Sequence, residues 1–289
     1  MTNTLSTHTE AVAQPDRKTR VPYPVRILLV CLLMFLNVFS VLLFYPVTLI
    51  PGFTEQSDTA LEWWGQLMRL IPAGASIGLV WLMMRFVDRR PLRETGLRFT
   101  RWSVPLWLLG IAGGIVAVLP ASVWLTSAGL LRPETDYYAG STPFMTLVGV
   151  VVLGLFMQGF PEELLWRGYA LQTMRGRPVL AVLVSALVFG AMHWFSGAGQ
   201  TNAAEHLIYC FAASGLGILA GALAVATRSV WSAVGVHFGL HLAYYFNSLL
   251  DAGTGPLLWA AEGVVFWALA AIVYLTGKRA FAPPITLER

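Results

Sequence analysis

Charged residues are scarce in this chain of 289 residues: Asp, Glu, Lys and Arg together make up 12% of it, against 56% hydrophobic residues. A soluble domain of that size carries about a quarter charged residues, so this composition excludes one. Cysteine is scarce as well, and Cys31 and Cys210 both lie inside apolar runs, which excludes a disulfide framework. The chain also lacks the strand-like alternation of an outer-membrane barrel, internal repeats and a glycine-rich phosphate loop. These absences leave a helical membrane protein.

Long apolar runs are what the chain has instead, and a helix of about 20 apolar residues is long enough to cross a bilayer. The first run, 27–50, exceeds the hydrophobic region of a cleavable signal peptide, so we expect it to stay as an anchor. Seven further runs follow at 63–87, 104–127, 144–165, 178–195, 207–226, 230–250 and 256–277. The sequence therefore predicts an all-α, polytopic membrane protein with about eight transmembrane helices.

Polar segments are expected at both ends of the chain. Residues 1–24 contain three prolines and several charges, a composition typical of a disordered tail. A second, short tail is predicted at 281–289. Between them we predict one transmembrane helical domain, 25–280, and the pattern of charge in its loops predicts that both tails are cytoplasmic.

Lys and Arg are concentrated in alternate loops. The loop at 51–62 has acidic residues and no base, whereas 85–101 contains six arginines. Basic residues return at 166–178, at 227–229 and at 278–279. Since cytoplasmic loops are enriched in Lys and Arg, we predict that the 85–101 loop and both termini are cytoplasmic. The basic residues flank apolar runs and are not interleaved with aromatic residues, so nucleic acid is not an expected partner.

Ionisable side chains inside the apolar runs are candidates for function, because a charge deep in a bilayer is costly unless it is paired or hydrated. Most of them lie in the second half of the chain: Glu162, Glu163, Arg167, His193, His206, His237 and His241. Arg69, in the second run, is more simply explained by snorkelling or pairing. We expect Glu205 and His206 in a loop or at an interface, apart from the reacting groups.

Glu163 and Arg167 are four residues apart with the acid first, an order that favours an ion pair on one face of a helix. We interpret this pair as structural. Glu162 points about 100° away around a regular helix, which leaves its carboxylate available to another group. Pro161, just before it, fits a first helical turn or a kink. The alternative is that both glutamates cap the cytoplasmic end of a helix.

Three segments are predicted to bring polar groups to one depth. If the chain turns at 175–178, Glu162 lies about 15 residues before the turn and His193 about 15 after it, each roughly 22 Å along its helix. His237 lies about nine residues beyond Arg228, or roughly 13 Å, and this level matches the other two if the 166–178 hairpin projects somewhat into the cytoplasm. His241 shares a helix face with His237, so it is expected at the same place.

Two further features concern the surroundings of these groups. Gly235 and Gly239 flank His237 at the GxxxG spacing, which lets another backbone or a peptide approach closely. Residues 196–205 are polar and contain glycine, although the preceding helix has not clearly crossed the bilayer. We expect them to line an aqueous cavity enclosed by protein, since lipid cannot solvate such backbone. The alternative places His193 nearer the far side of the membrane.

Three ordered motifs resemble those of the CPBP family of intramembrane proteases, which groups CAAX prenyl proteases with bacteriocin-processing and self-immunity proteins. The motifs are Glu162 and Glu163 followed by Arg167, Phe189 followed by His193, and His237 near the start of a late run. The resemblance covers about 145–250. The family's third motif usually has Asn four residues after its histidine, and here that position is His241.

The resemblance implies an intramembrane endopeptidase in which Glu162 activates water, while His193 orients that water or returns a proton. It also implies that His237 and His241 donate hydrogen bonds to the oxyanion of the tetrahedral intermediate. The residues that would support the site are Glu163, Arg167 and Phe189.

A metal mechanism is the alternative, and no cofactor is favoured. A zinc site could draw its ligands from Glu162, His193, His237 and His241, of which a catalytic zinc would use three together with a water. The sequence around the late histidines, HFGLH, lacks the glutamate of the HExxH motif of metalloproteases.

The expected partners are the lipid bilayer and a membrane-associated peptide or protein substrate, and the expected location is a bacterial inner membrane. Two other functions stay open at this point. One is a non-catalytic membrane scaffold or bacteriocin-immunity protein on the same fold. The other is a proton-coupled transporter with a relay of Glu and His, against which the absence of internal repeats counts.

Overall fold

The computed structural model describes residues 21–53, 55–132, 142–174 and 176–281. Over these residues the chain is helical and contains no strand, so the all-α prediction is confirmed. The predicted tails, 1–24 and 281–289, lie almost wholly outside these ranges, and so does residue 175 of the predicted turn.

The helices of the first half are α1 (Tyr23–Val38), η1 (Phe39–Phe44), α2 (Tyr45–Thr48), α3 (Asp58–Met68), α4 (Ile71–Leu82), η2 (Met83–Asp88), η3 (Leu92–Thr95) and α5 (Ser103–Ser127). Those of the second half are α6 (Pro143–Val151), η4 (Val152–Gly159), α7 (Phe160–Glu163), η5 (Leu164–Ala170), α8 (Leu171–Thr173), α9 (Pro178–Met192), η6 (His193–Phe195), α10 (Ala203–Thr227), α11 (Val230–Leu249), α12 (Pro256–Thr276) and η7 (Lys278–Phe281).

In the part of the chain that the structure describes, seven helical stretches are long and apolar enough to cross a membrane: Tyr23–Thr48, Asp58–Asp88, Ser103–Ser127, Phe144–Thr173, Pro178–Phe195, Ala203–Thr227 and Pro256–Thr276. They coincide with seven of the eight predicted runs, which confirms a polytopic helical membrane protein. The remaining run, 230–250, forms α11, which is 20 residues long. Its apolar sequence contains the polar residues His237, His241 and Asn247. These polar positions are tolerated because most of α11 is buried among other helices.

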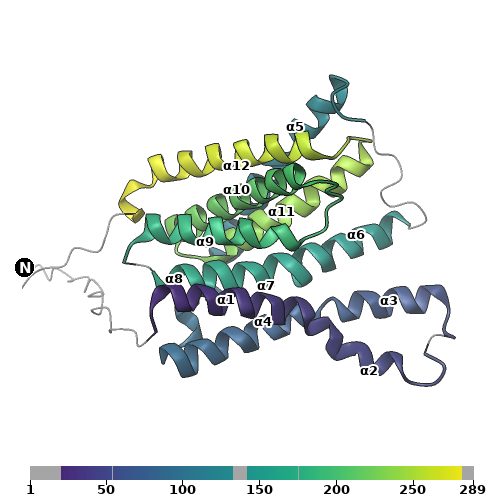
Figure 1. The fold of residues 1–289 in the computed structure, drawn as a ribbon, viewed down its shortest axis with the longest axis horizontal. Helices are drawn as coiled ribbons and strands as arrows, with labels where there is room; N and C mark the ends of the chain where they lie inside the picture. Colours follow the sequence, from purple (N-terminus) through teal and green to yellow (C-terminus); the bar gives the residue numbers. More distant parts are fainter. Residues whose placement is uncertain (1–20, 54, 133–141, 175, 282–289) are drawn as a thin grey trace, which may run out of the picture.

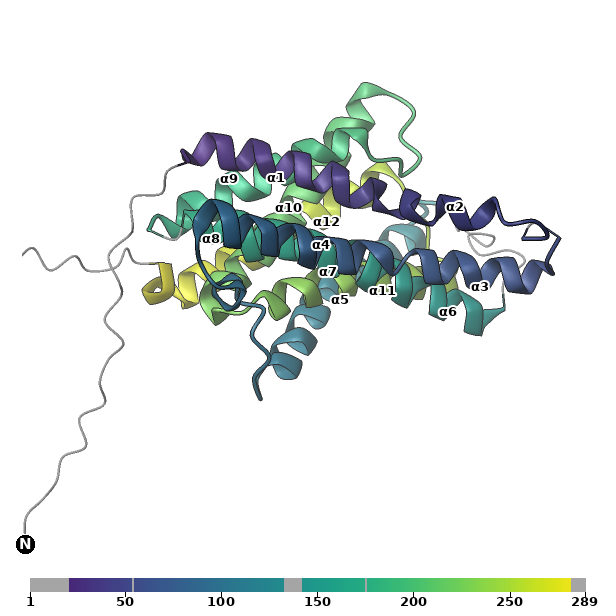
Figure 2. The same cartoon turned by 90° about the horizontal axis from the view of Figure 1, so that it is seen from below.

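The helices lie along one another, and α10 is the central one (Figure 1). In its most apolar stretch 72% of the residues are buried, against 28–33% in the other six stretches. In Figure 1, α12 borders α10 on one side, and α1 and α4 form the opposite border of the bundle. Seen from below in Figure 2, α4 lies in front of α7, and α1 lies in front of α9 and α10. Most residues of α7 and α11 are buried, so the two helices that carry most of the candidate residues are internal.

Glycines allow α5 and α11 to cross at close range. A Cβ atom on Gly235 would collide with the backbone of Trp107, and one on Gly239 would collide with the backbone of Ile111. The GxxxG spacing on α11 therefore serves the approach of another helix of the same chain. This crossing holds His237, which lies between the two glycines, at a fixed position against α5.

The arginine-rich loops lie together at one end of the bundle, where α1 begins and α12 ends on the left of Figure 1. The N–H of Val230 donates to the carbonyl oxygen of Gly96 at 3.3 Å, which joins the 85–101 loop to the turn between α10 and α11. At the same end, the buried guanidinium of Arg26 forms an ion pair with the buried carboxylate of Asp88. This grouping agrees with the alternation of charge between loops. The side of the membrane that this end faces stays a prediction.

Candidate active site

The two glutamates lie on a helix whose winding is not uniform. From Pro143 to Thr173 the chain runs through α6, η4, α7, η5 and α8, and π-helical turns precede and follow the four-residue α7. Pro161 has no N–H to donate and its ring crowds the preceding turn, which a wider π-helical turn accommodates. Glu162 and Glu163 therefore project from a short α-helical turn between two wider ones. The 100° spacing of a uniform α-helix, from which their directions were predicted, does not hold along this segment.

Glu163 binds two partners through a single oxygen. Its Oε1 accepts a hydrogen bond from Arg167 Nη1 at 3.1 Å, so the ion pair predicted from the spacing is present. The same Oε1 lies 3.1 Å from His237 Nδ1 on α11. All three side chains are buried. A carboxylate oxygen accepts, so Nδ1 of His237 carries the hydrogen, and Nε2 is the ring nitrogen left for another group. The sequence did not predict this contact.

Glu162 has an oxygen that no described side chain uses. Its Oε2 is buried and has no hydrogen-bond partner among the described residues, and the nearest histidine nitrogen, His237 Nδ1, is 4.0 Å away. That distance permits electrostatic attraction but is too long for a hydrogen bond. A buried carboxylate in this position retains its capacity to accept a hydrogen from a reacting group.

His193 comes directly after the last residue of α9, and its ring orientation is set by the backbone of that helix. Nδ1 lies 2.8 Å from the carbonyl oxygen of Phe189, one turn earlier. Since a carbonyl oxygen can only accept, Nδ1 carries the hydrogen, and in the neutral ring Nε2 is an acceptor. The ring also packs on Tyr209 of α10, with 5.9 Å between centroids. His193 is thus held with one nitrogen occupied and the other available.

Phe189 joins the three motifs. Its fully buried ring lies 4.5 Å from the ring of His193 and 6.4 Å from that of His237, measured between centroids. The guanidinium carbon of Arg167 lies 4.6 Å from the centroid of the same ring, within the range of a cation–π interaction. One aromatic side chain therefore contacts a residue from each of the other two segments that carry the motifs.

His241 stacks on His237, with 5.4 Å between ring centroids and 10° between ring planes. Its Nε2 is buried and has no hydrogen-bond partner among the described residues. Room for the ring comes from Gly154 in η4, where an added Cβ would lie 2.7 Å from the Cβ of His241. Nothing about Gly154 in the sequence distinguishes it from other glycines in apolar runs, so its role emerges only from the packing.

Residues 144–243, which run from α6 into α11, match the family described as type II CAAX prenyl endopeptidase, Rce1-like. The resemblance to CAAX proteases that the motifs predicted is confirmed over this segment. No curated protein matches the chain. The matched segment contains all of the predicted site residues: Glu162, Glu163, Arg167, Phe189, His193, His237 and His241.

The family assignment supports peptidase activity in general, since the family is one of endopeptidases. Together with the seven apolar spans, it also establishes an integral membrane protein. The matched segment begins after α5 and ends within α11. The CAAX protease motifs thus lie in the second half of the chain, as the resemblance predicted.

The zinc alternative requires three of the residues Glu162, His193, His237 and His241 to face one metal ion. Within the ranges that the structure describes, no group of three or more His, Cys, Asp or Glu side chains is placed to hold a metal ion. Two of the histidines have one ring nitrogen engaged elsewhere, His237 by Glu163 and His193 by the carbonyl of Phe189. Whether this protein depends on a metal stays a prediction that needs its own measurement.

A third buried glutamate in the membrane-spanning part was missed by the sequence analysis. Glu262 on α12 is 3% exposed and accepts a hydrogen bond at 3.0 Å from the hydroxyl of Tyr244. Its position inside the predicted run 256–277 was the signal that could have found it. Trp259, one turn earlier, contacts Tyr209, which in turn contacts His193. Glu262 thus lies near the candidate site without touching its reacting groups.

The expectation of an enclosed cavity at 196–205 is wrong. Gly197, Ala198 and Gly199 are exposed in the connection between α9 and α10, and α10 already begins at Ala203. Figure 2 shows this connection standing out from the side of the bundle. Just before this connection, the ring of Phe195 contacts the ring of Phe35 in α1. His193 therefore lies where α9 gives way to an exposed connection, at the end of that helix remote from the basic loops, as the alternative held.

Proposed function

We propose that this protein is an intramembrane endopeptidase that hydrolyses a peptide bond of a membrane-associated substrate, with Glu162 as the base that activates water. The observation that carries the proposal is the Glu162 carboxylate. It is buried, one of its oxygens has no partner among the described side chains, and it lies beside a histidine that a second glutamate holds in place. The family match over the same segment supports peptide hydrolysis as the reaction.

The proposed reaction begins when Glu162 takes a proton from a water molecule as the water oxygen attacks the peptide carbonyl carbon. His193 accepts a hydrogen bond from that water through Nε2, the nitrogen that its backbone contact leaves available. The carbonyl oxygen becomes an oxyanion. Glu162 then delivers its proton to the leaving amide nitrogen, the C–N bond breaks, and the products are a carboxylic acid and an amine.

The oxyanion needs hydrogen-bond donors fixed before the reaction starts. We assign this task to Nε2 of His237 and Nε2 of His241, whose rings stack on one another. His237 donates through Nε2 when both of its nitrogens carry a proton, and Glu163 keeps the ring in that orientation by accepting from Nδ1. The supporting roles of Glu163, Arg167 and Phe189 are positional in this proposal.

The decisive experiment replaces Glu162 by Gln in the purified full-length chain and follows cleavage of a membrane-associated peptide. Gln keeps the shape but cannot take a proton, so we expect turnover to fall by about 10²–10⁴-fold with normal insertion and folding. His193→Ala is expected to be nearly as damaging. Glu262→Gln is the matched control, because Glu262 is also a buried glutamate, and Gln can still accept from Tyr244.

Two outcomes would contradict the proposal. Equal activity of the wild type and Glu162→Gln would remove Glu162 from the chemistry. Full complementation of a deletion strain by Glu162→Gln, with no cleavage by either protein, would instead show a scaffold or immunity function in which the chain acts by its presence alone.

A further inference from the structure

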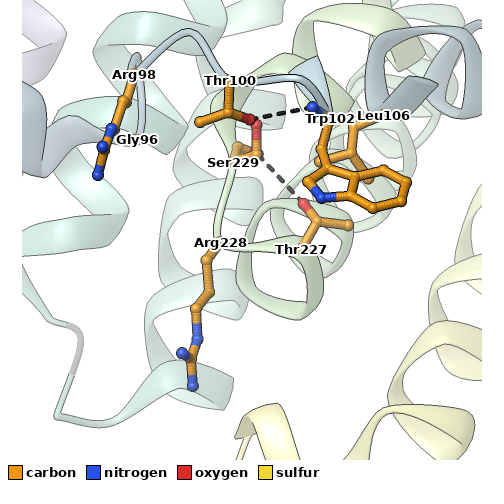
Figure 3. A pocket seen from close by; sticks show the side chains of 8 residues that line it. All are labelled: Gly96, Arg98, Thr100, Trp102, Leu106, Thr227, Arg228 and Ser229. Carbon is orange, nitrogen blue, oxygen red and sulfur yellow. Dashed lines mark hydrogen bonds between the residues drawn. The ribbon is translucent and has the colours of Figure 1, made fainter. Parts of the chain in front are cut away.

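A hollow of about 370 Å³ lies at the basic end of the bundle, where the segment before α5 meets the turn between α10 and α11 (Figure 3). The guanidinium groups of Arg98 and Arg228 point away from each other there, and away from the hydroxyls of Thr100 and Ser229. These side chains therefore do not converge on one ligand. Close contacts do converge deeper in the bundle, where α10 passes the buried guanidinium of Arg167.

The guanidinium of Arg167 is fully buried, yet only one of its nitrogens is hydrogen-bonded. Nη1 donates to Glu163, whereas Nε and Nη2 have no hydrogen-bond partner among the described residues. The ring of Phe189 lies against the same group, with 4.6 Å between the guanidinium carbon and the ring centroid. A group with one hydrogen bond can pivot about it, so the packing on its other sides decides where the guanidinium lies.

Gly217 of α10 provides the surface against which Nη2 of Arg167 packs. A Cβ atom at Gly217 would lie 2.6 Å from Nη2, far inside van der Waals contact, and 3.1 Å from Cα of Ala186 on α9. Gly217 is buried, and glycine is disfavoured relative to alanine inside a helix. The absence of a side chain at this point therefore gives the guanidinium its place.

The position of Arg167 reaches the candidate reacting groups through two short paths. Glu163 Oε1, which accepts from Arg167, also lies 3.1 Å from Nδ1 of His237. Phe189, which packs on the guanidinium, lies 4.5 Å from the ring of His193, measured between centroids. If the guanidinium is displaced, the shared oxygen of Glu163 either follows it or loses one of its two partners. Both outcomes change the orientation of the His237 ring.

We propose that Gly217 is a positioning residue for His237. By leaving room for Nη2 of Arg167, it sets the place of the Glu163 carboxylate and so the direction in which Nε2 of His237 points. Its effect on turnover rests on the proposed function, whereas its effect on His237 can be measured without any substrate. Gly217 lies on α10 and belongs to none of the three motifs.

Gly217→Ala tests this role, and Gly221→Ala, one turn later on α10, is the matched control. At Gly221 the atoms nearest to an added Cβ belong to Val182 of α9, at 3.2 Å, and to Leu171. Both variants therefore press on a neighbouring helix, but only Gly217→Ala presses on the guanidinium of Arg167. In the purified full-length chain, we expect the kcat of Gly217→Ala for a membrane-associated peptide to fall by about 10- to 100-fold with little change in KM, because a misplacement of about 1 Å costs up to about 10²-fold. Gly221→Ala should stay close to the wild type.

Arg167→Lys separates displacement of the guanidinium from pressure on α9. Lys keeps the charge that pairs with Glu163 but carries a single nitrogen, so no second nitrogen remains to collide with the new Cβ. We therefore expect Gly217→Ala to cost far less turnover in the Arg167→Lys background than beside the native arginine. An equal fold-loss on both backgrounds would mean that Gly217 acts through the packing of α9 and α10, and would overturn the proposal. Equal turnover of Gly217→Ala and Gly221→Ala would overturn it as well.

Nitrogen-15 spectra of the histidine-labelled chain test the positioning role without turnover. Glu163 accepts from Nδ1 of His237, and the signal of this nitrogen can be assigned with His237→Gln. We expect Gly217→Ala to shift the signal and Gly221→Ala to leave it in place, and an unchanged signal in folded Gly217→Ala would overturn the proposal.

The remaining outcomes are also decisive. If Gly217→Ala does not fold, Gly217→Ala/Arg167→Lys should fold, because the collision with Nη2 is removed, and failure of both would overturn the proposal. If the wild type cleaves no peptide while the His237 signal still shifts in Gly217→Ala alone, the proposed function fails and the positioning role stands.

Discussion

The imidazole Nδ1 of His237 lies 3.1 Å from Glu163 Oε1 but 4.0 Å from Glu162 Oε2. Two adjacent glutamates on one short helical turn are therefore divided between two tasks. Glu163 holds a cation and an imidazole through one oxygen, and Glu162 keeps an oxygen that is not committed to a described side chain. This division predicts different outcomes when each glutamate is removed.

Glu163→Ala should lower folded yield and stability more than Glu162→Ala does. Removing Glu163 leaves Arg167, which is fully buried, without its only described ion-pair partner, and breaking a buried ion pair costs about 3–5 kcal/mol. Arg167→Ala should behave in the same way. Thermal unfolding of the three purified variants in one detergent would measure the effect. Wild-type yield and stability of Glu163→Ala and Arg167→Ala would refute the assignment of a structural pair.

Arg26→Ala should also destabilise the protein strongly, although Arg26 is far from the motifs in sequence. Arg26 and Asp88 are each 1% exposed, so the same cost of about 3–5 kcal/mol applies. Arg90→Ala provides the comparison, because its pair with Glu94 is more exposed and should contribute about 1 kcal/mol or less. Similar unfolding temperatures for Arg26→Ala and Arg90→Ala would mean that the buried pair does not tie α1 to the rest of the bundle.

His241→Asn tests whether the chemistry depends on a metal. It restores the residue usual in the family and keeps a hydrogen-bond donor, so turnover should stay close to that of the wild type. His241→Ala removes the donor and should lose about 10²–10³-fold. Elemental analysis of both purified variants and of the wild type accompanies the assay. Zinc bound by the wild type, and lost from His241→Asn together with activity, would replace the metal-free mechanism with the zinc alternative.

Both termini should be on the cytoplasmic side. The arginine-rich loops lie at one end of the bundle, and the positive-inside bias orients that end toward the cytoplasm. Reporter fusions within the 51–62 loop and after Lys278 should therefore give opposite signals. An external signal after Lys278 would mean that α11, which is less apolar than the other spans, does not cross the bilayer.

The spans and the motif residues could be predicted from the sequence because both depend on local information. A run of apolar residues indicates a membrane helix wherever it packs, and an ionisable residue inside such a run is unusual by itself. The pairing of Glu163 with Arg167 is also local, since four residues separate them.

The remaining features depend on contacts between segments that are distant in the sequence. Whether His237 meets Glu162 or Glu163 is decided by the winding of the chain around Pro161 and by the packing of α11, neither of which periodicity reveals. The pairing of Arg26 with Asp88 requires α1 to lie against η2. The exposed connection at 197–199 was assigned to a cavity because its polar composition is the same in either setting.

The position of Phe189 has a consequence for anyone who engineers this site. Its ring contacts His193, His237 and Arg167, so a change in its size moves three functional groups at once. Substitutions at these four positions should therefore show strong epistasis, with double variants departing from the sum of the single effects. A library that varies the motifs one at a time would miss the productive combinations, and a transplant of the site into another helical bundle must include the phenylalanine with the charged residues.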